Sequence, residues 1–309
     1  MNGAPSEMEL AATPSQTPAA DLRLRSPAAA GCNCGGADCP TCGPRLSTGT
    51  RADVRGYIYA LGRIEARFPN LSVEKEFAQA TARAETAGLS DRTLLQTVLS
   101  NPENAYLARQ LCWTFSIEGV DSYLLLPRDA ADVRTLVEAL RPTPRLTDID
   151  VVVGTVGPPL PAGACAGLQL PTVSWAQIYS FDVDSFVSSL PRPEGLNAKQ
   201  FAASAEEILE RVMQLADNGG LTDDQRALNY LVLRYPAICQ AVAERHAANR
   251  SFTGVETRAS PLGGARRIVE VIFSFRDRRT DVVEKLFVRV DVNELFPFLV
   301  SKLAPYYDR

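Results

Sequence analysis

Four cysteines in one short stretch have the spacing that most directly suggests chemistry. These tail cysteines are Cys32, Cys34, Cys39 and Cys42, in GCNCGGADCPTCG. Four thiolates can hold one zinc ion tetrahedrally or bind an iron–sulfur centre. The C-x-x-C half has ordinary metal spacing, whereas the C-x-C half is tighter than most zinc knuckles use. The pattern predicts a zinc site, with iron–sulfur as the less favoured metal; the open alternative is that these thiols are simply reactive or are themselves modified.

No other residue has a setting that predicts catalysis. The single histidine, His246, lies in AERHAANR on an expected amphipathic helix, and no serine or cysteine beside it forms a triad-like setting. The chain has no P-loop, no G-x-G-x-x-G after a strand and no H-E-x-x-H. Cys112, Cys165 and Cys239 lie in apolar surroundings, which predicts small buried hydrophobic residues. We therefore expect no catalytic and no cofactor-binding residue.

Arginines gather around a predicted hairpin near the C-terminus. Arg266 and Arg267 precede one strand, and the run 276–279 contains three more arginines. Guanidinium groups bind carboxylates through paired hydrogen bonds, so this cluster could bind an acidic peptide. The solvated ends of a hairpin explain the same pattern and are the more common case.

Composition separates a tail from a globular part. Residues 1–50 are rich in Ala, Pro, Ser, Thr and Gly and show no period, which predicts a disordered tail before a domain at 51–309. A net charge of -4 with evenly mixed charges argues against nucleic-acid binding. No apolar run is long enough to span a membrane, and the start has no secretory signal. We expect a cytoplasmic protein with reduced cysteines.

The globular part alternates blocks of helices and strands. Strands are expected at 57–62, 111–117, 122–126, 148–153, 168–175, 253–258, 267–275 and 282–290. Helices are expected at 72–87, 90–100, 129–140, 182–189, 197–217, 222–249 with a kink at Pro236, and 293–303. We expect Ser72, Ser90, Asp129 and Thr222 to cap four of these helices. Such blocks predict an α+β fold with mainly antiparallel sheets, and the Pro/Gly-rich region 154–197 is a candidate subdomain boundary.

Several long stretches carry a family resemblance. They include YIYALGRIEARFPNLSVEKEFAQA, NAYLARQLCWTFSIEGVDSYLLLPRD, ADNGGLTDDQRALNYLVLRYPAI and VEVIFSFRDRRTDVVEKLFVRVDVNELFPFLVSKLAPYYDR. Together with IYSFDVDSF they resemble the C-terminal domain of the cyanobactin maturation proteases PatG and PatA, over essentially all of residues 56–309. In that family the domain follows a subtilisin-like protease and has no established catalytic activity. No such protease region is seen here, so protease or macrocyclase activity does not carry over.

The resemblance implies a role in the biosynthesis of ribosomally synthesised, post-translationally modified peptides. We expect a non-protease accessory protein that binds a precursor peptide or a peptide-modifying enzyme, and a homodimer is compatible with this. The alternative is an enzyme of unrecognised chemistry that uses a metal held by the tail cysteines. A third interpretation is that the tail is itself a modifiable peptide fused to its carrier.

Overall fold

Strand β1 (Tyr57–Arg67) is apolar on both faces because each face is buried against a different core. Ile58, Ala60 and Ile64 point into one core, whereas Tyr59 and Leu61 point into the other. Successive side chains of a strand alternate between its faces, so one strand can serve two layers. The computed structural model describes residues 56–83, 88–215 and 218–307. Within them, the α+β class with mainly antiparallel sheets is confirmed.

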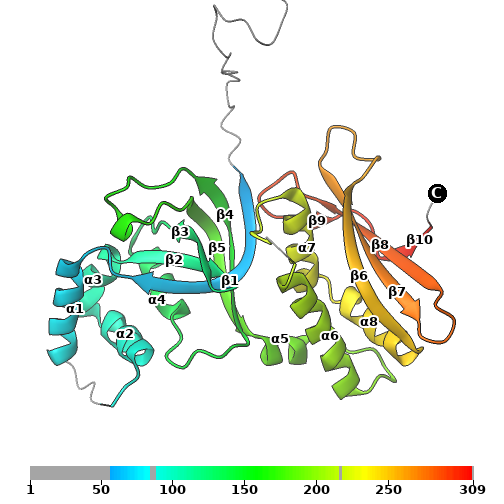
Figure 1. Cartoon of the computed structure of the whole chain (residues 1–309), viewed down its shortest axis with the longest axis horizontal. Helices are drawn as coiled ribbons and strands as arrows, with labels where there is room; N and C mark the ends of the chain where they lie inside the picture. The colour runs from blue at the N-terminus through cyan, green and yellow to red at the C-terminus, as the bar shows by residue number, and fades with distance from the viewer. Residues whose placement is uncertain (1–55, 84–87, 216–217, 308–309) are drawn as a thin grey trace, which may run out of the picture. The chain divides into compact units, whose positions relative to one another are not determined.

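The first sheet closes on itself as a barrel in the order β1-β2-β3-β5-β4 (Figure 1). Its other strands are β2 (Cys112–Ile117), β3 (Val120–Leu125), β4 (Asp148–Gly157) and β5 (Thr172–Asp182). Neighbouring strands are antiparallel except β3 and β5, which close the barrel with a short parallel pair. The β2–β3 turn has positive φ at Glu118 and Gly119, as expected for a tight two-residue hairpin. Strands β1, β4 and β5 are longer than expected from the sequence.

Helices cover the barrel; three of them match expected helices, the short helices at 102–110 are not expected from the sequence, and one cap is assigned wrongly. These are α1 (Leu71–Arg83), α2 (Asp91–Ser100), η1 (Pro102–Asn104), α3 (Ala105–Gln110) and α4 (Ala130–Ala139). Ser90 and Asp129 cap α2 and α4 as expected. Ser72 does not cap α1, because the Asn70 side chain accepts from the amides of Ser72 and Val73.

The second sheet is built from the C-terminal strands in the order β10-β8-β7-β6. Its strands are β6 (Arg250–Ala259), β7 (Ile268–Asp277), β8 (Val283–Asp291), β9 (Phe298–Leu299), which pairs with β8, and β10 (Ala304–Tyr306). All these pairs are antiparallel, and the expected hairpin joins β7 to β8. Alternate β7 residues from Val269 to Phe275 face the core, so Glu270 and Ser274 lie on the opposite, outer face.

A helical layer lies between the barrel and the second sheet. It contains α5 (Val183–Ser189), α6 (Ala198–Met213), α7 (Asp223–Arg234) and α8 (Ala237–Ala247). The short η2 (Cys165–Gly167) lies apart from this layer, in the barrel loop before β5. Helix α7 packs against both β1 and β7, and Figure 1 shows it between the two sheets. The expected capping box of Thr222 and Gln225 opens α7. The predicted kink is a complete break between α7 and α8 at Pro236, because proline lacks an amide hydrogen.

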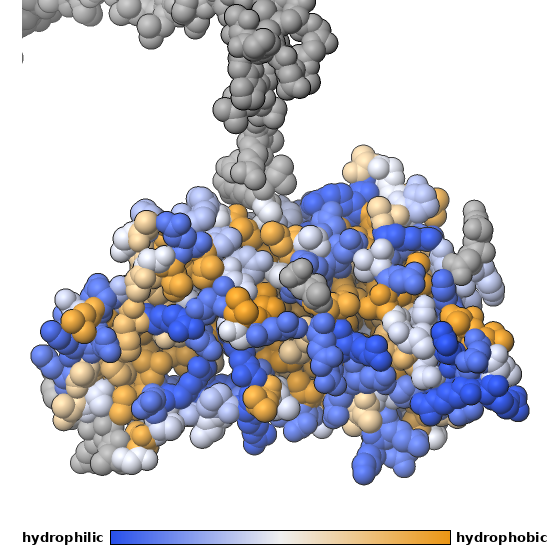
Figure 2. All heavy atoms as spheres, viewed as in Figure 1, coloured by the Kyte–Doolittle hydropathy of each residue, from blue (hydrophilic) through white to orange (hydrophobic). Residues whose placement is uncertain are grey.

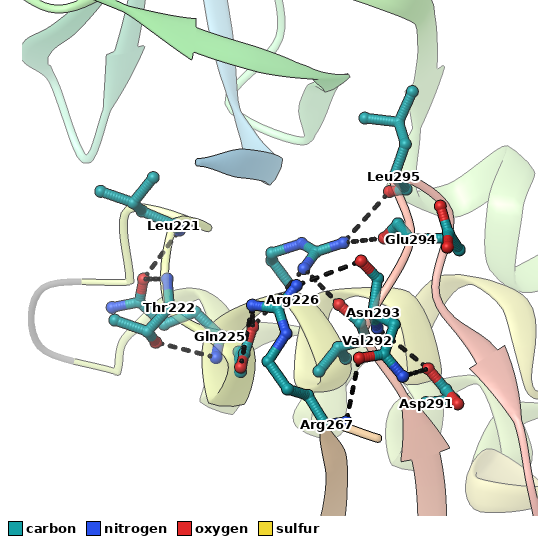
Figure 3. A network of polar contacts seen from close by, with 11 residues as sticks. Leu221, Thr222, Gln225, Arg226, Arg267, Asp291, Val292, Asn293, Glu294 and Leu295 are labelled. Carbon is teal, nitrogen blue, oxygen red and sulfur yellow. Dashed lines mark hydrogen bonds and ion pairs between the residues drawn. The ribbon is translucent and has the colours of Figure 1, made fainter. Parts of the chain in front are cut away.

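The expected C-terminal helix at 293–303 is wrong. Pro297 would fall inside it, where its ring clashes with the carbonyl one turn earlier. The buried guanidinium of Arg226 also donates hydrogen bonds to backbone carbonyls of this segment, those of Val292, Glu294 and Leu295 (Figure 3). With its carbonyls bonded to a side chain, the segment runs irregularly into β9 and β10.

The described residues cluster into one compact unit. Within the parts described, no helix is long and apolar enough to cross a membrane.

Candidate functional site

The tail cysteines lie outside the described residues, so their predicted zinc site stays a prediction. Within the described ranges, no group of three or more His, Cys, Asp or Glu side chains is arranged to hold a metal ion.

The expectation of three buried thiols is wrong for two of the cysteines. Cys112, at the start of β2, and Cys165, in the loop before β5, form a disulfide across 53 positions of sequence. Cys239 is a buried free cysteine as predicted, and burial raises the pKa of its thiol to about 11. A thiol that stays protonated at neutral pH is a poor nucleophile. Spacing in sequence could not reveal the disulfide, because the loop folds back over the barrel.

The structure places a serine and a carboxylate beside His246, contrary to the sequence interpretation. Ser204 Oγ lies 3.2 Å from His246 Nδ1, and Glu207 Oε2 lies 3.4 Å from Nε2. The Ser204 hydroxyl donates to the Gln200 carbonyl over 2.9 Å, so Nδ1–H must donate to Oγ. A general base needs the opposite direction of hydrogen bonding, because it takes the proton from the hydroxyl. Ser204 is also only 1% exposed, so this cluster is a helix–helix contact between α6 and α8 and not an active site.

The predicted basic cluster is divided between ion pairs and solvent. Arg266 bonds Asp291, and Arg267 bonds Asp223 over 3.0 Å. Arg276 lies 3.9 Å from the exposed Asp281 at the β7–β8 hairpin. Figure 2 shows the surface at this hairpin covered by hydrophilic residues. Arg266 and Arg267 are therefore held in ion pairs before β7, whereas the solvated-hairpin interpretation accounts for Arg276. A different pair of arginines marks the candidate site.

That site is a groove of about 560 Å³ on the outer face of the second sheet. We call it the arginine groove; its lining includes Arg258, Leu262, Glu270, Phe287, Arg289 and Tyr306. The strand register creates it, since Arg258 of β6 and Arg289 of β8 both pair with Glu270 of β7. Residues directly opposite on neighbouring strands point to the same face, so the three charged side chains form one row.

The carboxylate of Glu270 is the centre of the arginine groove. Its Oε2 accepts from Nε and Nη2 of Arg258 over 2.9 and 2.8 Å. Its Oε1 accepts from Arg289 Nε over 2.8 Å and from Ser260 Oγ over 3.0 Å. Burial alone would raise the pKa of Glu270, but these hydrogen bonds outweigh it and hold the pKa below its ordinary value. Glu270 is therefore ionised at neutral pH, and its two arginines are held in place.

Aromatic rings support both arginines. The Arg258 guanidinium lies 4.7 Å from the ring centre of Tyr306, and that of Arg289 lies 4.8 Å from the ring centre of Phe287. The two rings meet edge to face, 5.7 Å apart. A cation on an aromatic face is stabilised electrostatically and loses conformational freedom. The arrangement can therefore bind an anion with little reordering.

Sequence reasoning missed the arginine groove, although a signal was present. Glu270 interrupts the apolar run IVEVIF, and Arg289 interrupts LFVRV. A charged residue inside a strongly apolar strand must point away from the core or find a partner. Only the register between strands, which a single sequence does not give, shows that these two residues and Arg258 share one row.

Comparisons with known proteins identify the domain. The family model described as "PatG Domain" matches residues 57–255. The chain belongs to the PatG domain family. It is also similar to a solved structure titled "PatG Domain of Unknown Function", with 20% sequence identity and a TM-score of 0.63, over 82% of this chain and 99% of that one. No curated protein matches the chain. The arginines and Glu270 of the groove all follow residue 255, so the PatG family match does not extend to them.

Proposed function

We propose that this PatG-family protein is a non-protease accessory protein of modified-peptide biosynthesis that binds a precursor peptide or a partner enzyme. The arginine groove is the observation that carries the proposal. It offers oriented cationic groups beside apolar surface, which is a binding arrangement. Membership of the PatG family supplies the biosynthetic setting. The cytoplasmic location expected from the sequence belongs to the same proposal.

The residues that could argue for peptide hydrolysis support this view by their geometry. His246 is the only histidine of the chain, and its neighbour Ser204 is buried and already donates its proton elsewhere. An acyl-transfer site needs a nucleophile that substrate can reach and a base that accepts its proton. The cluster offers neither.

The test uses the peptides and enzymes encoded beside this chain's own gene. The purified full-length chain is mixed with each fluorescently labelled precursor peptide and each neighbouring enzyme, and binding is measured by fluorescence anisotropy. Mass spectrometry of the same mixtures detects any cleavage or modification by the chain alone. We expect binding to at least one partner and no change in the mass of any peptide.

Two results would overturn the proposal. One is the absence of binding to every neighbouring peptide and enzyme. The other is turnover of a peptide by the purified chain. If the His246→Ala variant lost that turnover, the helix–helix cluster would have to be catalytic. If turnover instead depended on added zinc and on the tail cysteines, the metal-dependent enzyme would replace the accessory protein.

A further inference from the structure

We infer that the arginine groove binds an acidic side chain of a peptide, with an apolar neighbour of that side chain on Leu262 and Tyr307. This inference rests on the proposed function and specifies the chemistry of its ligand. It concerns residues after 255, which the family match does not cover.

Glu270 does not use all the donors of its two arginines. Arg258 donates to it through Nε and Nη2, which leaves Nη1 without a bond to Glu270, and the Tyr306 hydroxyl is also within hydrogen-bond reach of this guanidinium. Arg289 donates to it through Nε, which leaves both Nη atoms. A guanidinium has five N–H donors in a fixed plane and binds carboxylates through paired hydrogen bonds. The unused edges can therefore receive a second carboxylate while Glu270 keeps the arginines in position.

The groove presents positive charge to solvent. The side chain of Arg258 is 48% exposed and that of Arg289 is 24% exposed, whereas that of Glu270 is only 1% exposed. One carboxylate shared by two guanidinium groups leaves an excess positive charge, and the buried member of the row is the anion. A ligand entering the groove meets the cations first. Charge complementarity therefore selects an anionic group.

Apolar side chains border the charged row. Leu262 is 71% exposed and Tyr307 is 80% exposed, and both line the groove. Large exposed apolar residues next to oriented cations suit a ligand that carries an apolar group close to its carboxylate. A volume of about 560 Å³ is within the usual range for sites that enclose a ligand of a few residues. A peptide segment with an acidic residue between apolar ones meets all three conditions.

The probe is a synthetic peptide of sequence Ala-Phe-Glu-Leu-Ala, acetylated at its N-terminus and amidated at its C-terminus. The control peptide is identical except that Gln replaces Glu. A third peptide also has Gln in place of Glu, but its C-terminus is a free carboxylate and not an amide. Titration calorimetry with the full-length chain compares the three. Charge-assisted hydrogen bonds predict that the Glu peptide binds roughly tenfold more tightly than the capped Gln peptide. Its affinity should also fall as salt is raised.

Matched variants locate the binding. Arg258→Gln should lower the affinity for the Glu peptide roughly tenfold. Arg276 lies on the same sheet but outside the groove, and its side chain is 55% exposed. Arg276→Gln should therefore leave the affinity for the Glu peptide unchanged. Because Arg258→Gln removes a partner of a buried carboxylate, its folding is checked by circular dichroism. Leu262→Ser leaves the charged row intact and should still weaken binding several-fold, which tests the groove if Arg258→Gln misfolds.

The outcomes separate this inference from the proposed function. Equal affinities for the capped Glu and Gln peptides would overturn the acidic-side-chain assignment. Preference for the free C-terminal carboxylate would overturn it in favour of a peptide terminus. If a neighbouring precursor binds equally well to Arg258→Gln and the unmodified chain, the groove fails and the accessory role survives. If only the Glu peptide binds, and does so through the groove, the groove survives and the accessory role fails.

Discussion

The side-chain amide of Asn229 in α7 donates a hydrogen bond over 2.8 Å to the carbonyl of Tyr59 in β1, 170 positions earlier in the chain. Asn229 is fully buried, and it also exchanges hydrogen bonds with the side chain of Asn218. The carbonyl of Gly220 accepts from the Tyr59 amide over 2.9 Å. Both backbone polar groups of one β1 residue are therefore bonded to the helical layer, which joins that layer to the barrel.

We expect Asn229→Ala to destabilise the protein by about 2–3 kcal/mol, because it leaves buried polar groups of Tyr59 and Asn218 without partners. Urea unfolding followed by circular dichroism measures the change. Gln79→Ala, on the exposed side of α1, is the matched control and should change stability by less than about 0.5 kcal/mol. Similar losses for the two variants would show that the Asn229 contacts are dispensable.

The buried carboxyl of Asp150 in β4 predicts that Asp150→Asn and the unmodified chain differ in stability by an amount that depends on pH. Burial raises its carboxyl pKa above the ordinary 3.8, even though the Ile64 amide donates to Oδ2 over 2.7 Å. A raised pKa in the folded state means that stability is greatest below the unfolded pKa and falls as pH rises through the folded pKa. Asp150→Asn removes this titration and retains an oxygen that can accept from Ile64.

The stability of Asp150→Asn minus that of the unmodified chain should therefore increase as pH is raised from about 4 to about 8. Thermal unfolding of both proteins across this pH range gives the difference in stability. The contributions of other titrating groups are the same in both proteins and cancel in this difference. A difference that stays constant with pH would mean that Asp150 titrates alike in the folded and unfolded chains. A difference that decreases would mean that the folded state favours the ionised form.

Reduction of the Cys112–Cys165 disulfide should destabilise the domain. A cross-link spanning 53 positions restricts the unfolded chain, which typically adds about 2–4 kcal/mol to stability. Dithiothreitol should lower the melting temperature of the unmodified protein. It should have no effect on a double variant with both cysteines changed to Ala, which serves as the control.

The redox state in cells tests the expected location. Disulfides are rare in reducing compartments, so a cytoplasmic chain would carry this pair partly or wholly reduced. Thiol trapping followed by mass spectrometry of the protein from its native cells measures the oxidised fraction. Complete oxidation there would contradict the cytoplasmic expectation, whereas equal melting temperatures with and without reductant would contradict the stabilising role.

Local signals in the sequence predicted most elements correctly. Asp129 and the Thr222–Gln225 box mark their helix starts because capping depends on residues a few positions apart. The two apolar faces of β1 were visible in YIYAL, but not that they serve two different cores. The expected C-terminal helix does not form, because Pro297 interrupts it and because Arg226, from far along the chain, bonds carbonyls of this segment.

The candidate site depends on such long-range relationships. The row of Arg258, Glu270 and Arg289 exists only once three strands are in register. The contact between His246 and Ser204 joins helices 42 positions apart, so a reading of neighbouring residues could not find it. Local spacing, as at the tail cysteines, gives a prediction of metal binding that falls outside the described residues and stays a prediction.

The tail cysteines are expected to bind about one zinc ion per chain, because four thiolates satisfy its tetrahedral coordination. Protein purified without added zinc is analysed by inductively coupled plasma mass spectrometry. A variant with all four tail cysteines changed to Ser should lose the metal, whereas the double variant that lacks the disulfide should retain it. Binding requires deprotonated thiols, so affinity should fall as pH drops below neutral. Chelation should leave the unfolding midpoint unchanged, since the tail is predicted to lie outside the core. Equal zinc content in the two variants would exclude this site.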